Sequence, residues 1–121
     1  MRFPASDLAA LAAAEEIDIE TRAAEGTVHR TIVRVMVRDG EVYLRSFKGP
    51  AGRWYRETLA DPSVGLHVDG RRIAATAQPA IDPASVEACS AGLREKYAAS
   101  FSLAAMLVDS VLQTTIRVVP A

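Results

Sequence analysis

The stretch VHRTIVRVMVRDGEVYLRSF, residues 28–47, decides the fold class of this chain. Val33, Val35 and Val37 occupy alternate positions, and a period of two is typical of a β-strand. The dipeptide Asp39-Gly40 that follows favours a two-residue hairpin turn. We therefore expect residues 41–47 to return as an antiparallel partner strand.

The same patterns recur on both sides of this hairpin. Residues 16–23, 63–68, 71–77 and 111–120 show strand-like alternation, and Asp69-Gly70 predicts a second hairpin. Helical spacing appears over residues 7–15, 54–61, 86–97 and 102–109, and Asp82-Pro83 is a typical helix start. This order predicts a small antiparallel sheet or barrel, mainly β (α+β), in a single domain over residues 1–121.

Composition limits the classes of protein that fit. The chain has 121 residues, a net charge of −1 and one cysteine, so it has no intrachain disulfide and suits a reducing compartment. No apolar run approaches the roughly 20 residues that span a membrane, and acidic residues interrupt the alanine-rich start too early for a secretory signal. We therefore expect a cytoplasmic location without membrane association. The net charge and an aromatic content of 6% argue against nucleic-acid binding.

Positive charge is nevertheless concentrated in one region. Residues 30–56 hold seven basic residues against Asp39 and Glu41, whereas residues 1–26 hold six acidic residues and two arginines. Two interpretations remain open at this point: a solvated basic surface beside an acidic one, or an anion-binding site.

The connection SFKGPAGRWYRETLADP, residues 46–62, contains the groups that an anion needs. Guanidinium, ammonium and hydroxyl groups lie within a few positions there, glycines allow close backbone approach, and a helix starts nearby. An aromatic side chain could stack on a planar ring. The predicted cofactor-binding residues are Arg30, Arg45, Ser46, Lys48, Gly49, Arg53, Trp54 and Tyr55. The alternative is a solvated loop in which Trp54 is a core anchor.

Other chemistry finds less support in the sequence. His29 and His67 lack metal-ligand spacing, so no metal site is predicted. Cys89 lies on the apolar stripe of its helix and is expected to be buried and unreactive. No nucleophile, phosphate-loop or dinucleotide motif occurs, and no catalytic residue is assigned.

Residues 30–80, from RTIVRV to ATAQPA, resemble the uncharacterised family known as domain of unknown function 2255, and nearly the whole chain fits that family. The same stretch is similar to a compressed deazaflavin-dependent nitroreductase. Trp54, Tyr55, Leu59, Ala60 and Pro62 fall on the pattern of that family. Two features depart from it: Glu57 stands where asparagine is usual, and the glycine-rich segment is reduced to residues 25–27.

This resemblance implies a six-stranded antiparallel split β-barrel with a short helix after strand 3 and helices before the last strand. Proteins of this kind are homodimers that bind flavin mononucleotide (FMN), deazaflavin or haem at the dimer interface. The implied function is therefore that of a flavin- or deazaflavin-binding oxidoreductase-like protein, with haem ranked lower. The flavin would carry the hydride chemistry itself. The alternative is a cofactor-free interaction or scaffold domain.

Overall fold

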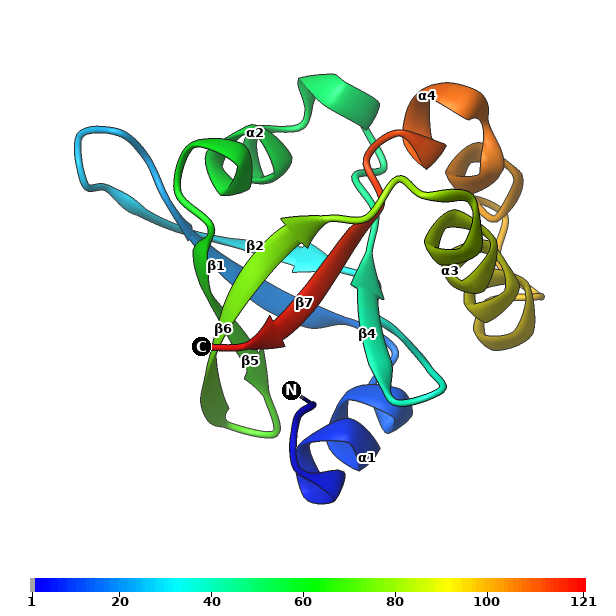
Figure 1. The fold of residues 1–121 in the computed structure, drawn as a ribbon, viewed down its shortest axis with the longest axis horizontal. Coiled ribbons are helices and arrows are strands. Elements are labelled where there is room, and N and C mark those ends of the chain that lie inside the picture. The colour runs from blue at the N-terminus through cyan, green and yellow to red at the C-terminus, as the bar shows by residue number, and fades with distance from the viewer. Residues whose placement is uncertain (1) are drawn as a thin grey trace.

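The computed structural model describes residues 2–121 and shows an α+β fold built on one antiparallel sheet that curls into a half-barrel (Figure 1). The sheet has seven strands in the order β2-β1-β5-β6-β7-β4-β3. The strands are β1 (Ile17–Arg22), β2 (Val28–Val33), β3 (Met36–Arg38), β4 (Glu41–Leu44), β5 (Ser63–Val68), β6 (Arg71–Pro79) and β7 (Ile116–Pro120). The helices are α1 (Ala5–Ala13), α2 (Arg53–Ala60), α3 (Pro83–Lys96) and α4 (Asp109–Leu112), with short 3₁₀ turns at Gly49–Ala51 and Ala104–Leu107.

The prediction of six strands was wrong because the long strand over residues 28–38 breaks at Arg34 and Val35. The first part, β2, pairs with β1, and the second part, β3, pairs with β4. These two strands are the opposite ends of the sheet order, so the break joins its two edges. The short helix α2 consequently follows the fourth strand rather than the third.

Both predicted hairpin turns are present. Asp39 and Gly40 have φ angles of 52° and 78°, and Asp69 and Gly70 have 51° and 72°. Positive φ at both central residues is the geometry that matches the twist of the flanking strands. These turns set the registers of β3 with β4 and of β5 with β6.

Strand ends differ from the expectation in two places. Residues 45–47 leave the sheet after Leu44, and residues 111–115 belong to α4 and the turn after it. Thr114 and Thr115 hydroxyl groups bond the carbonyls of Val111 and Leu112, which favours a turn over a strand at this point.

Two groups of apolar side chains form the core. The larger lies within the curled sheet and includes Leu11 of α1 and Trp54 of α2. The smaller lies between the sheet and α3 and contains Met36, Cys89 and Tyr97. The predicted start of α3 is confirmed, since the Asp82 carboxylate accepts a hydrogen bond from the Ser85 N–H at 3.1 Å.

Candidate functional site

An open groove with a volume of about 300 Å³ lies between β2 and the loop that leads into α2. Its lining residues are Thr31, Ile32, Ser46, Phe47, Lys48, Gly52, Arg53 and Trp54. Four of the eight predicted cofactor-binding residues therefore line one groove: Ser46, Lys48, Arg53 and Trp54. No acidic residue is among the lining residues.

Ser46 is buried beneath the loop that leads into α2. Its backbone N–H donates to Thr114 Oγ1 at 2.9 Å, and the residue is 1% exposed. Its Oγ is buried and has no hydrogen-bond partner in the described residues. A Cβ at position 52 would collide with this oxygen, so Gly52 is what allows the α2 start to approach Ser46. The site thus contains a hydroxyl group whose hydrogen-bonding capacity is unused.

Lys48 and Arg53 supply the positive charge of the groove. Both are exposed, and Arg53 Nη2 makes a weak contact of 3.4 Å with Thr31 Oγ1. None of the ion pairs within residues 2–121 uses either cation. Two free cations over a groove without acids form an environment that attracts an anion.

Trp54 is a wall of the groove and also a core residue. It is 6% exposed, packs in the larger core group, and meets the Tyr55 ring edge-on with ring centroids 6.4 Å apart. The core-anchor interpretation is therefore correct for most of this side chain. Tyr55 is half-buried and does not line the groove.

Arg45 lies in the interior, with 2% of its surface exposed. Its guanidinium group donates to Thr115 Oγ1 and to the Val86 carbonyl, both at 2.8 Å, and to the Met106 carbonyl at 3.3 Å. Three of its five N–H groups are thus used in hydrogen bonds that link the end of β4 to the segments around α3 and α4. The remainder of its surface lines a hollow beside the groove.

Arg30 and Gly49 lie outside the groove. Arg30 pairs with Asp18 of β1 at 2.9 Å and lines a different pocket. Gly49 has a φ of +67° and faces Ser110 of α4, and its N–H donates to the Ser46 carbonyl. Its positive φ shapes the loop, and its N–H is already bonded.

The hollow beside the groove is lined in part by residues that are not among the predicted cofactor-binding residues. It has a volume of about 240 Å³ and shares Ile32, Phe47 and Trp54 with the groove. Arg34 and Ser102 line it, and Arg34 Nη2 donates to Ser102 Oγ at 2.6 Å. These two residues are 68 positions apart, and no local pattern in the sequence connects them.

Glu57, the residue that departs from the family pattern, fastens α2 to the sheet. Its carboxylate accepts a hydrogen bond from Thr21 Oγ1 at 2.6 Å and contacts His29 Nδ1 at 2.9 Å. Burial raises the pKa of this carboxyl, but the bonds from Thr21 and His29 outweigh it and lower the pKa overall. The helix that carries Arg53 and Trp54 is therefore anchored at its middle.

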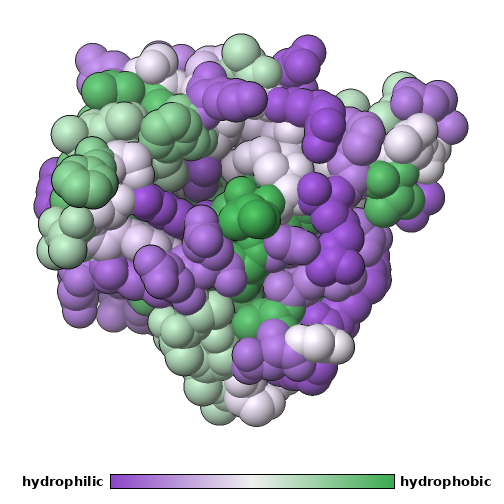
Figure 2. All heavy atoms as spheres, turned by 180° about the vertical axis from the view of Figure 1, so that it is seen from behind, coloured by the Kyte–Doolittle hydropathy of each residue, from purple (hydrophilic) through white to green (hydrophobic). Residues whose placement is uncertain are grey.

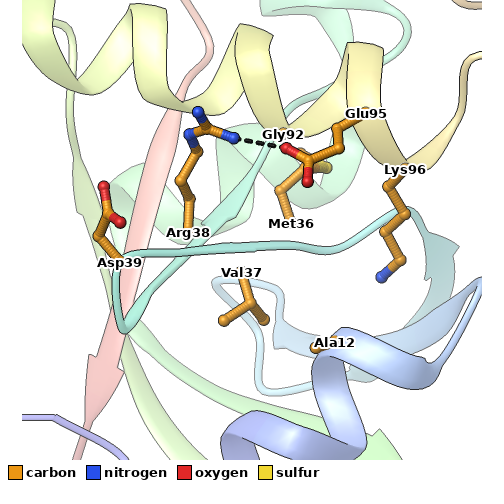
Figure 3. Close-up of a pocket in the computed structure, with 8 residues that line it drawn as sticks. All are labelled: Ala12, Met36, Val37, Arg38, Asp39, Gly92, Glu95 and Lys96. Atoms are coloured by element: carbon orange, nitrogen blue, oxygen red, sulfur yellow. Dashed lines mark hydrogen bonds and ion pairs between the residues drawn. The ribbon is translucent and has the colours of Figure 1, made fainter.

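A larger cavity of about 520 Å³ lies between α1, β3 and α3 (Figure 3). Its two cations are already engaged: Arg38 pairs with Glu95 at 2.7 Å, and Lys96 Nζ donates to the Val35 and Leu11 carbonyls. Because both cations have partners within the chain, this cavity is less suited to binding an anion than the groove is.

The two histidines are engaged with carboxylates on different parts of the sheet. His67 Nε2 lies 2.8 Å from Glu20, which also accepts two bonds from Arg72, while His29 contacts Glu57. Within residues 2–121, no group of three or more histidine, cysteine, aspartate or glutamate side chains is arranged to hold a metal ion.

A family model described as "Uncharacterized protein conserved in bacteria (DUF2255)" matches residues 7–118. The chain belongs to this family. A search of curated proteins found no match.

Solved structures share the fold of this DUF2255 protein. HutZ, the heme storage protein from Vibrio cholerae, matches with a TM-score of 0.68 at 11% identity, over 100% of this chain and 92% of that chain. An F420-H2 dependent reductase (FDR-A) matches with a TM-score of 0.66 at 16% identity, over 87% and 93%. A conserved hypothetical protein from Mycobacterium tuberculosis gives 0.67 at 17% identity, over 98% and 79%. At these identities the similarity establishes a common fold, the split barrel that the family resemblance implied.

The surface around the groove has apolar as well as basic character. Ile32 is 65% exposed and Phe47 is 55% exposed. Figure 2 shows hydrophobic residues near the centre of one face and on the side formed by the segment after α3, set among hydrophilic residues.

None of the helices in the described part of the chain combines the length and apolarity of a membrane span.

Proposed function

We propose that the groove binds the anionic tail of a flavin-like cofactor, FMN or a deazaflavin, and that the protein is an oxidoreductase-like member of the split-barrel group. The observation that carries this proposal is the convergence of Ser46, Lys48 and Arg53 on the Trp54 side chain without any acidic lining residue. Charge-assisted hydrogen bonds from lysine and arginine are the strongest that a phosphate can receive.

Each residue has a distinct part in this proposal. Lys48 and Arg53 hold the phosphate, and the unpartnered Ser46 hydroxyl adds a donor once the loop adjusts. The start of α2, where Gly52 is the N-cap and no side chain caps the helix, adds unpaired N–H groups. Phe47 and Ile32 offer apolar surface to a planar ring. A bound flavin would supply hydride transfer, while these residues bind and orient it.

Haem needs the same test as the flavins. HutZ is a heme storage protein and FDR-A is an F420-H2 dependent reductase, and both match the fold with similar scores. The sequence-based ranking of haem below the flavins therefore gains no support from the fold. We retain FMN and deazaflavin as the proposal because Lys48 and Arg53 suit a phosphate or carboxylate tail.

A homodimer remains part of the proposal. Exposed Ile32 beside the groove favours it. Met36, which the strand alternation of residues 30–38 would place on the same face as Ile32, is instead fully buried against α3. Light scattering of the wild type should give a dimer mass, and Ile32→Lys should shift the mass towards the monomer. A wild-type monomer at micromolar concentration would contradict the dimer.

The cofactor proposal is tested by thermal shift with FMN and with riboflavin, which has the same ring without the phosphate. FMN at about 100 times its dissociation constant should stabilise the protein by about 2.7 kcal/mol, and riboflavin should stabilise it much less. Deazaflavin F420 and haem are tested in parallel. If none of these ligands binds, the cofactor-free scaffold is the better interpretation.

A further inference from the structure

The hollow beside the groove has its own polar centre. Arg34, Arg45 and Ser102 line it together with Glu16 at the rim. The apolar lining residues are Ile32, Val33, Phe47, Trp54 and Met106. One polar end and several apolar walls fit a small amphiphilic molecule rather than a bare ion.

Arg34 is fixed in place and only partly used. Its Nη2 donates to Ser100 Oγ and Ser102 Oγ at 2.5 Å and 2.6 Å, and its guanidinium lies 4.7 Å from the centre of the Tyr97 ring. Its Nη1 is buried and has no hydrogen-bond partner in the described residues. A buried donor without a partner is costly, and a ligand oxygen that reached Nη1 after a small shift of the Arg34 side chain would satisfy it.

The charge of the hollow matches a monoanion. Arg34 and Arg45 are two cations, and Glu16 is the one acidic lining residue, so a single positive charge remains. Arg45 donates to three groups of the chain itself, whereas Arg34 keeps one donor, Nη1, without a partner in the described residues. A carboxylate, with its single negative charge, balances this charge better than a phosphate dianion does.

We propose that this hollow binds the carboxylate of a small organic acid with an aromatic or branched apolar body. Arg34 Nη1 donates to the carboxylate, Ser102 assists, and Phe47, Trp54 and Met106 contact the body. Because the hollow shares Ile32, Phe47 and Trp54 with the groove, the acid lies next to the proposed cofactor. Its role as substrate rests on the proposed function, whereas carboxylate binding itself does not.

Binding is tested on the wild-type protein without any cofactor. Benzoate is titrated into ¹⁵N-labelled protein, with benzamide as the neutral ligand of the same shape. We expect saturable shifts at Arg34, Ser102 and the Trp54 indole N–H with benzoate and none with benzamide. Equal binding of both ligands, no binding of benzoate, or shifts confined to residues 48–53 would overturn the proposal.

Variants then locate the site. Arg34→Gln should weaken benzoate binding by about tenfold or more, the range for a lost charge-assisted bond. Arg38→Gln is the matched control, because Arg38 is nearby in sequence but pairs with Glu95, and it should leave the affinity unchanged. An unchanged affinity in Arg34→Gln would refute the assignment. If that variant does not fold, the benzoate–benzamide comparison decides alone.

Two further comparisons separate this site from the cofactor groove. Lys48→Ala should leave benzoate binding unchanged, since Lys48 lines only the groove. Phenyl phosphate should bind the hollow less tightly than benzoate does. Tighter binding of phenyl phosphate there, or a loss of benzoate binding in Lys48→Ala, would show that both anions use the groove and would overturn the inference.

Discussion

The Tyr97 hydroxyl group bonds the backbone of Val35, the residue at which the two edges of the sheet are joined. It accepts a hydrogen bond from the Val35 N–H at 3.2 Å and lies 3.3 Å from the Val35 carbonyl oxygen, to which Lys96 Nζ also donates at 2.7 Å. Val35 belongs to neither β2 nor β3, so Lys96 at the end of α3 and Tyr97 at its C-cap supply the partners that a sheet would otherwise provide.

Tyr97→Phe should therefore destabilise the protein by about 1–3 kcal/mol, the cost of leaving a buried donor unsatisfied. Urea unfolding followed by circular dichroism measures the change. Tyr43→Phe is the control, because Tyr43 packs in the same core group but does not bond Val35, and it should cost less. Equal losses in the two variants would mean that this hydroxyl does not secure the closure.

The buried thiol of Cys89 should be inert in the native protein. Cys89 is 0% exposed, and burial raises the pKa of its thiol to about 11, partly offset by the nearby Arg45. Since the thiolate is the reactive species, labelling by a thiol reagent should be very slow in buffer and rapid in denaturant. Rapid labelling of native protein at neutral pH would show that α3 opens or that the site is accessible.

The lowered pKa of the Glu20 carboxyl predicts a loss of stability in acid. Hydrogen bonds from Arg72 and then His67 lower its pKa from 4.5 to about 2. A depressed pKa stabilises the folded state above the unfolded pKa, so this stabilisation is present above about pH 4.5 and is lost as the pH falls towards 2. Glu20→Gln should cost about 1–2 kcal/mol at pH 7, less than the full shift implies because Arg72 is half exposed.

The difference between wild type and Glu20→Gln should shrink through that acid range. Glu95→Gln, which removes an ion pair whose carboxylate is 75% exposed, should change stability little at any pH. Chemical unfolding at several pH values measures both variants. If the loss of stability in Glu20→Gln stayed constant from neutral pH to pH 2, the ionised Glu20 carboxylate would not be its cause.

The sequence predicted the parts of the fold that depend on neighbouring residues. Asp39-Gly40 and Asp69-Gly70 specify their turns locally, and Asp82 caps α3 through its own first turn. The break at Arg34 and Val35 was not predicted, because the alternation of apolar residues continues through it. At the break the Val35 N–H donates to the Tyr97 hydroxyl, 62 positions away along the chain.

The residues of the candidate site divide in the same way, into those whose position follows from neighbouring residues and those whose position depends on distant contacts. Ser46, Lys48, Arg53 and Trp54 come from one connection, so their proximity could be expected from the sequence. The interior position of Arg45 could not, because its partners are the Val86 and Met106 carbonyls and Thr115, which only the packing of α3 and α4 brings near. An arginine at a strand end is usually exposed, and only these internal acceptors make its burial favourable.

The most direct test of the central claim is the dissociation constant of FMN for Arg53→Ala and Arg56→Ala, measured by isothermal titration calorimetry. Both residues are exposed arginines of α2, but only Arg53 lines the groove. The proposal predicts that Arg53→Ala, like Lys48→Ala, weakens binding by about 1.5–3 kcal/mol with little change in stability, while Arg56→Ala binds as the wild type does. Equal effects of Arg53→Ala and Arg56→Ala, or no binding of FMN to the wild type, would contradict it.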